Sequence, residues 1–167
     1  MGHFNFENLS TAIRAMQAMD ADQQHQLDVR MAMNQHELFE ALQSPLQHGA
    51  SAADIAELMD ILATVYLTME QSGLPWPRIS REVLDRAEKR VTAGIVFTHD
   101  LPDAYPEKTN FHWIDGHPER YLFSQIAQRI SSYGYSGSPA GEVHFNLALF
   151  ILVEALAIVG KTLPRSS

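Results

Sequence analysis

The chain of 167 residues contains no cysteine, so disulfide bonds and thiolate chemistry are excluded from both catalysis and metal binding. Basic residues are also few. There are 12 Lys and Arg against 20 Asp and Glu, which gives a formal net charge of −8. Binding to a nucleic-acid backbone requires a basic surface, so we expect no nucleic-acid partner. A nucleotide remains possible, because its phosphates can be reached through a bound cation.

Targeting signals and long apolar runs are equally scarce. The first ten residues, MGHFNFENLS, contain neither the basic nor the apolar segment of an export signal, which predicts a cytoplasmic protein. One long apolar stretch, VHFNLALFILVEALAIVG, covers residues 143–160. It is marginal in length for a membrane span and contains His144, Asn146 and Glu154. We therefore predict no membrane contact, and interpret 143–160 as a helix buried in the core or at a subunit interface.

The remaining sequence has helical periodicity. Apolar residues recur at intervals of three and four, between capping residues and breaks that contain Pro or Gly. We predict a first helix capped by Asn8 or Ser10 and ending near Met19. Further helices follow at about 23–46, 52–71, 81–94, 118–132 and 143–160, with an irregular loop over 95–117 and a linker over 131–142. The expected fold is an all-α helical bundle that forms a single domain over 1–167.

Two pairs of acidic residues lie on neighbouring predicted helices. Glu37 and Glu40 are three residues apart in HELFEAL, and Glu57 and Asp60 are three residues apart in AELMDIL. Residues at this spacing share one helical face, where like charges repel each other. No lysine or arginine lies within one turn of either pair, so the sequence offers no local partner for these charges.

The short connection between the two helices predicts an antiparallel hairpin that carries both acid pairs. Because the pairs lie at matching distances from the turn, we expect their four carboxylates to converge. Clustered carboxylates stay ionised only beside a cation, and oxygen ligands suit Mg²⁺ or Mn²⁺. The pattern therefore predicts a metal site formed by Glu37, Glu40, Glu57 and Asp60. The alternative is that they are ordinary surface acids, since either pair alone is common on solvated helices.

The arrangement Glu37-x-x-Glu40, sixteen residues, Glu57-x-x-Asp60 resembles the signature of the MazG-like all-α nucleoside triphosphate pyrophosphohydrolases. The resemblance covers about residues 23–93 and includes IAELMDILATVYLTMEQSGL, which is similar to the family's second acidic helix and its glycine turn. It implies that the four acids bind Mg²⁺ and that a nucleoside or deoxynucleoside triphosphate is cleaved to the monophosphate and pyrophosphate. It also implies a homodimer or tetramer. Glu37 or Glu40 would then act as the general base.

The sequence departs from the family pattern at two places. His36 stands where many members have a further glutamate, and it either orients a water or is a neutral replacement. Many members also hold the phosphates with Lys-x-x-x-Asn-x-x-Arg on the next helix, and the corresponding positions here are Val83, Ala87 and Arg90. The predicted substrate contacts are therefore Arg90, Lys89, Arg86 and His36.

Two further functions remain open. A chain that lost these phosphate contacts could have lost turnover and act as a helical interaction or regulatory protein. The third possibility is an HD-type metal phosphohydrolase, which requires a histidine, an adjacent His-Asp pair and a distant aspartate. His48, His99 with Asp100, and Asp115 match that pattern only weakly.

Overall fold

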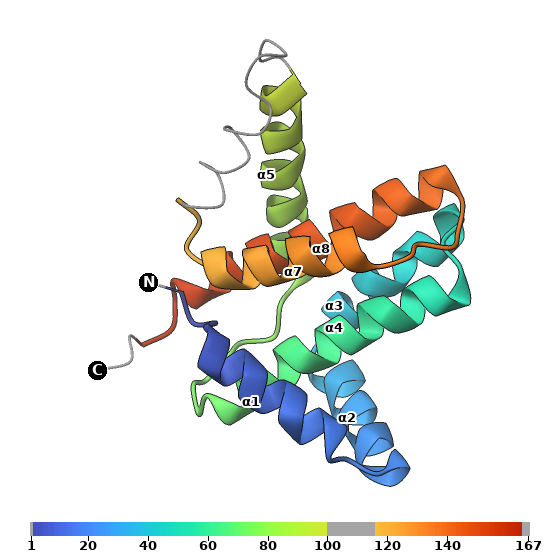
Figure 1. Cartoon of the computed structure of the whole chain (residues 1–167). Helices are drawn as coiled ribbons and strands as arrows, with labels where there is room; N and C mark the ends of the chain where they lie inside the picture. Colours follow the sequence, from blue (N-terminus) through green and yellow to red (C-terminus); the bar gives the residue numbers. More distant parts are fainter. Residues whose placement is uncertain (1, 100–115, 165–167) are drawn as a thin grey trace.

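A computed structural model describes residues 2–99 and 116–164, with the backbone alone for 95–99. Within these residues all regular secondary structure is helical, so the prediction of an all-α fold is confirmed (Figure 1). The elements are α1 (Phe6–Gln17), α2 (Ala21–Asn34), α3 (His36–Gln43), the 3₁₀ helix η1 (Ser44–His48), α4 (Ala52–Gln71), α5 (Arg81–His99), α7 (Arg120–Ser132) and α8 (Pro139–Gly160).

The C-terminal helix α8 lies at the centre of the core. Its residues Leu149, Leu152 and Leu156 are fully buried, and α3, α4, α5, α7 and η1 all pack against it. Within the described residues, α8 alone is long and apolar enough to cross a membrane, with a mean hydropathy of 2.1. In this fold 67% of that apolar window is buried. The helix begins at Pro139, four residues before the predicted start, because the Ser138 hydroxyl caps it by accepting from the Gly141 N–H at 3.2 Å.

The predicted helix 23–46 is wrong as a single element, because the structure divides it at Gln35 into α2 and α3. Gln35 has φ −129° and ψ 49°, and it is 4% exposed. Its side-chain amide donates to the Pro77 carbonyl at 3.1 Å and accepts from the Ile79 N–H at 2.9 Å. The break therefore places the Gln35 side chain where it forms hydrogen bonds with backbone groups of the Pro-containing segment that leads to α5.

Other helix ends differ by a few residues from the prediction. α4 begins after Ser51 and ends at Gln71, as expected. α1 begins earlier, because Asn5 and Asn8 form a reciprocal capping box with hydrogen bonds of 2.9 Å. α5 continues to His99, so residues 95–99 are helical and not irregular. The rest of the predicted loop, residues 100–115, lies outside the described residues.

α1 packs against α4, whereas α7 lies against α8 (Figure 1). The start of α1 is close to the C-terminal end of α4, and Met16 near the end of α1 contacts Thr64. The end of α7 is close to the N-terminal half of α4, where Arg129 reaches Glu57. α4 therefore packs against α1, and it is joined to α7 through the side chain of Arg129.

Asp54, in the first turn of α4, fixes the segment between α7 and α8. It is fully buried, and its carboxylate accepts from the Ser51 N–H at 2.8 Å, the Tyr133 hydroxyl at 2.8 Å and the Ser136 N–H at 3.1 Å. Burial raises the pKa of Asp54, but these hydrogen bonds outweigh burial and hold the pKa well below its ordinary value. Burial and the bond to the anionic Asp54 raise the pKa of Tyr133 to about 12.

Replacing Gln35 by alanine should destabilise the protein. The substitution leaves the Pro77 carbonyl and the buried Ile79 N–H without their partner, so we expect the free energy of unfolding to fall by about 2–4 kcal/mol. Urea denaturation followed by circular dichroism measures the change. Gln24→Ala, at an exposed position of α2, is the matched control and should change stability by less than about 0.5 kcal/mol. Equal effects of the two substitutions would contradict this account of the helix break.

The Asp54→Asn variant should be destabilised at neutral pH and not at acidic pH. The folded-state pKa of Asp54 lies below the unfolded-state value of about 3.9, so its stabilisation is complete above that value and is lost as the pH falls. We therefore expect the stability difference between wild type and variant to narrow from pH 5 downward in urea titrations. Asp22→Asn, in the first turn of α2, is the control without buried partners. A difference that stays constant on acidification would exclude this role of Asp54.

Candidate functional site

The two predicted acid pairs have different surroundings, although their helices α3 and α4 pack against each other. Glu40 lies on the exposed side of α3, where its carboxylate is 3.2 Å from the His36 Nε2, and both side chains are about half exposed. Glu37 is partly exposed and has no hydrogen-bond or ion-pair partner among the described residues. Glu57 and Asp60 are instead bound by an arginine from α7.

Arg129 is the partner of the second acid pair. Its Nε donates to Glu57 Oε1 at 2.6 Å and its Nη2 donates to Asp60 Oδ2 at 2.5 Å. The spacing of three residues on α4 places the two carboxylates where the planar guanidinium can bind both at once. Burial lowers the pKa of Arg129, but the hydrogen bonds to the two acids outweigh burial and raise it. The arginine therefore stays charged and leaves the three groups with a net charge of −1.

The donors of this region do not fit the Mg²⁺ or Mn²⁺ ion that the resemblance implies. Within the described residues, no group of three or more His, Asp and Glu side chains is arranged to hold a metal ion. Arg129 engages Glu57 and Asp60, and His36 lies against Glu40. The expected convergence of four carboxylates on one ion is thus not observed. The predicted hairpin with converging acid pairs is not confirmed.

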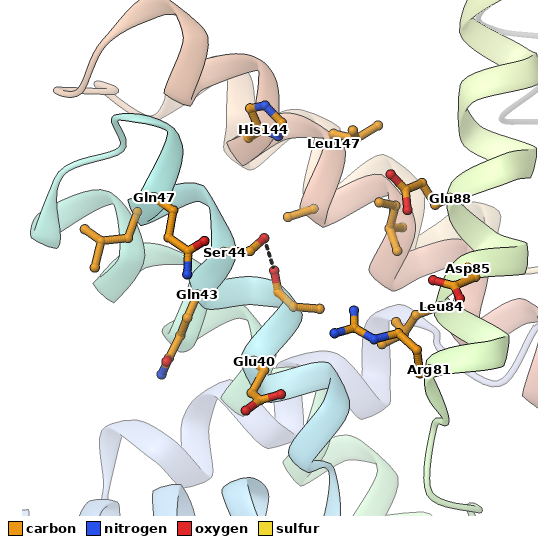
Figure 2. Close-up of a pocket in the computed structure, with 14 residues that line it drawn as sticks. Glu40, Gln43, Ser44, Gln47, Arg81, Leu84, Asp85, Glu88, His144 and Leu147 are labelled. Carbon is orange, nitrogen blue, oxygen red and sulfur yellow. Dashed lines mark hydrogen bonds between the residues drawn. The ribbon is translucent and has the colours of Figure 1, made fainter.

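A pocket of about 570 Å³ lies between α3, η1, α5 and α8, and Glu40 is the one predicted metal ligand that lines it (Figure 2). Asp85 and Glu88 line the pocket from α5, and Arg81 extends from the same helix toward α3. Three carboxylates against one guanidinium give the pocket a negative character, to which His144 adds a neutral or positive imidazole. A triphosphate without a cation would be repelled here.

Arg90, the predicted phosphate contact, is used to join α5 to α8. Its Nη1 donates to Glu154 Oε1 at 3.0 Å, and the other oxygen of Glu154 is 2.8 Å from the His117 Nε2. The Glu154 side chain is only 9% exposed. Burial raises its pKa, but the hydrogen bonds from His117 and Arg90 outweigh burial and lower it. Lys89 and Arg86 are exposed and form no ion pair within the described residues.

The positions that correspond to the family's lysine and asparagine do not line the 570 Å³ pocket. Ala87 is fully buried in the core, and Val83 packs against the core while partly buried. A long or polar side chain at Ala87 would enter the packed interior. The absence of the family's residues at these positions therefore agrees with the packing of α5.

Arg129, His117 and Glu119 lie at buried or paired charges and were not among the predicted site residues. Glu119 is 2% exposed, and its carboxylate accepts from the His3 N–H at 2.7 Å and the Phe4 N–H at 3.1 Å. Burial raises the pKa of Glu119 more than these bonds lower it. The Glu119 N–H donates to the His117 Nδ1 at 3.1 Å, which leaves the Nε2 proton of His117 to point at Glu154. Both ring nitrogens of His117 are therefore engaged.

One sequence signal could have indicated Arg129. It stands on a predicted helix, in QIAQRISSY, with no acid within one turn. An arginine without a local partner, in a chain with excess acid, predicts a distant carboxylate partner. His117 and Glu119 gave no such signal, because both lie at the edge of the irregular region.

The weaker HD-type pattern is not tested by the described residues. The His48 ring stacks on His144 of α8, with ring centroids 3.6 Å apart and an angle of 11° between the planes. Asp100 and Asp115 lie outside the described residues, as does the side chain of His99. This function stays a prediction.

Comparison of the chain with protein-family models, curated proteins and solved structures finds no match. The MazG-like resemblance therefore depends on the sequence pattern of residues 23–93 alone.

Replacing Arg129 by methionine should leave Glu57 and Asp60 side by side without a positive partner. We expect the free energy of unfolding to fall by about 1–2 kcal/mol, since the guanidinium is partly exposed and screened. Denaturant titration at low and high salt measures the loss, which should shrink as salt increases.

A double-mutant cycle supplies the control for this prediction. Arg129→Met combined with Glu57→Gln should cost less than the sum of the single changes. Arg30→Met removes a guanidinium that binds only one carboxylate, Glu70, and should cost below about 1 kcal/mol. Strict additivity of Arg129→Met and Glu57→Gln would contradict the direct contact.

Proposed function

We propose that this chain is a helical binding protein that does not hydrolyse nucleoside triphosphates through a metal ion held by Glu37, Glu40, Glu57 and Asp60. The observation that carries the proposal is the position of Arg129. Its guanidinium makes two charge-assisted hydrogen bonds to the acid pair that would have to supply half of the metal ligands.

The energetics of the acid pair support this proposal. Mg²⁺ loses its water ligands reluctantly and requires near-octahedral oxygen coordination. Glu57 and Asp60 already bind Arg129, so we expect them to bind Mg²⁺ weakly. The ion would first have to displace the guanidinium of α7. The two charge-assisted hydrogen bonds of Arg129 together stabilise the fold by about 1–2 kcal/mol, because Arg129 and Asp60 are partly exposed and screened.

The phosphate side of the predicted site supports the same conclusion. Arg90, whose side chain is 47% exposed, binds the buried Glu154, and the pocket that Glu40 lines contains an excess of carboxylates. A triphosphate would therefore meet neither a free arginine at the expected position nor a cation held by the acids. A helical interaction function does not require Arg129 or Arg90 to leave its observed carboxylate partner.

One observation favours the second candidate, a Mg²⁺-dependent pyrophosphohydrolase that forms a homodimer or tetramer. The pocket beside Glu40 has a volume of about 570 Å³, which is within the range of small-molecule sites. This function requires Arg129 to leave Glu57 and Asp60 when substrate binds. The two candidates therefore differ in a measurable way.

Calorimetric titration with Mg²⁺ and non-hydrolysable nucleoside triphosphate analogues should give no saturable heat, because Arg129 already binds Glu57 and Asp60. A panel of NTPs and dNTPs with Mg²⁺ or Mn²⁺ should likewise release pyrophosphate no faster from wild type than from Asp60→Asn. Release that requires the metal and is lost in Asp60→Asn would overturn the proposal and establish the pyrophosphohydrolase.

A further inference from the structure

The pocket of about 570 Å³ beside Glu40 combines apolar and charged side chains in one concave surface. It lies between α3, η1, α5 and α8, and all four elements contribute apolar residues to it: Ala41, Leu46, Leu84, Leu147, Ala148 and Ile151. Leu84 and Ala148 are buried, while Leu46 is 53% exposed. Concave surfaces of this size, with apolar side chains and a few polar groups, are typical of small-molecule sites.

Carboxylates lie on two sides of this pocket. Asp85 and Glu88 line it from α5, where their separation of three residues places them on one face of the helix, and Glu40 lines it from α3 (Figure 2). Asp85 and Glu88 have no ion-pair or hydrogen-bond partner among the described residues. Glu40 has only the His36 ring, at 3.2 Å. The negative charge of the pocket is therefore not used within the fold.

Arg81 is the only lysine or arginine among the residues that line the pocket, and it forms no ion pair within the described part of the chain. Three carboxylates and one guanidinium leave the lining with a net charge of −2 while the His144 imidazole is neutral. That ring stacks on His48, with centroids 3.6 Å apart. An occupant with two positive charges would neutralise this lining, whereas an anion would be repelled.

The arrangement of the acids favours an organic dication over a metal ion. In residues 2–99 and 116–164, no group of three or more His, Asp and Glu side chains is arranged to hold a metal ion. The carboxylates of α3 and α5 thus do not converge on one ion, but each side can meet a separate ammonium group. The methylene chain that joins two ammonium groups is apolar and can pack against Leu84 and Leu147.

We propose that the pocket between α3, η1, α5 and α8 binds a linear aliphatic diamine or polyamine. One ammonium group lies beside Asp85 and Glu88, another lies beside Glu40, and the methylene groups contact the apolar lining. This inference rests on the proposed function, because it names a ligand for a chain that binds without hydrolysis. Asp85 and Glu88 are not among the four predicted metal ligands, so substituting them tests the pocket separately from the second acid pair.

Isothermal titration with 1,4-diaminobutane and with spermidine tests the inference. At about pH 8 and low ionic strength the amines are charged, while an imidazole is ordinarily neutral. n-Butylamine has the same carbon chain with one charge and is the ligand control. The test variant combines Asp85→Asn with Glu88→Gln.

The matched control variant combines Asp22→Asn with Glu82→Gln. Both side chains are exposed, neither lines the pocket, and the net charge changes by the same amount as in the test variant. Circular dichroism verifies that both variants are folded.

The expected result is saturable binding of one diamine per chain. The test variant should bind it about five- to thirtyfold more weakly than wild type, and the control variant within about twofold of wild type. n-Butylamine should bind wild type at least about fivefold more weakly than 1,4-diaminobutane. The affinity for the diamine should decrease as salt increases.

Three results would each overturn the inference. Heat that does not saturate, or an equal loss in both double variants, would show only diffuse attraction to a chain of net charge −8. Equal affinity for n-butylamine would exclude a site for two charges. Displacement of the diamine by equimolar MgCl₂ would assign the carboxylates to a metal ion.

The two proposals fail in different experiments. Metal-dependent pyrophosphate release removes the proposed function whatever the amines do. Absence of diamine binding, together with absence of pyrophosphate release, removes only the assignment of the pocket.

Discussion

The contact of Arg129 with Glu57 and Asp60 determines how the acidic face of α4 can be used. Two like charges three residues apart on a helix repel each other, and a single guanidinium from α7 removes most of that repulsion. The same contact joins the C-terminal part of α7 to the N-terminal half of α4. This interaction therefore occupies the two carboxylates that were predicted to bind a metal ion.

Buried charged groups also hold the segments that precede and follow α7. Glu119 accepts hydrogen bonds from the backbone of His3 and Phe4, and His117 joins Glu154 of the central helix. Asp54 fixes the segment that follows α7. Each of these carboxylates is enclosed but has hydrogen-bond donors, as buried charges require. The acids of this chain that lie in the interior are used mainly to connect segments that are distant in sequence.

The helical class and most helix limits could be predicted from the sequence, because periodicity and capping are local properties. Ser51 and the apolar period of α4 illustrate this. The break at Gln35 could not be predicted, since its cause is a contact with Pro77 and Ile79 more than forty residues away. The contact that Arg129 makes at the candidate site could not be predicted for the same reason. The local sequence around Glu57 and Asp60 contains no base, while the partner Arg129 is distant in sequence. Arg90 was predicted to contact phosphate, and its observed partner, Glu154, belongs to the core helix and could not be predicted from the local sequence.

The central claim is that Arg129, and not a divalent ion, is the cation of the second acid pair. Nitrogen-detected NMR of the arginine Nε–H groups, with Arg129 assigned from its loss in Arg129→Lys, tests it most directly. The account predicts a Nε–H signal that exchanges slowly with water and keeps its position as MgCl₂ or MnCl₂ is titrated, apart from general salt effects. A saturable shift or exchange broadening of that signal at stoichiometric metal would show that the ion displaces the guanidinium, and would contradict the account.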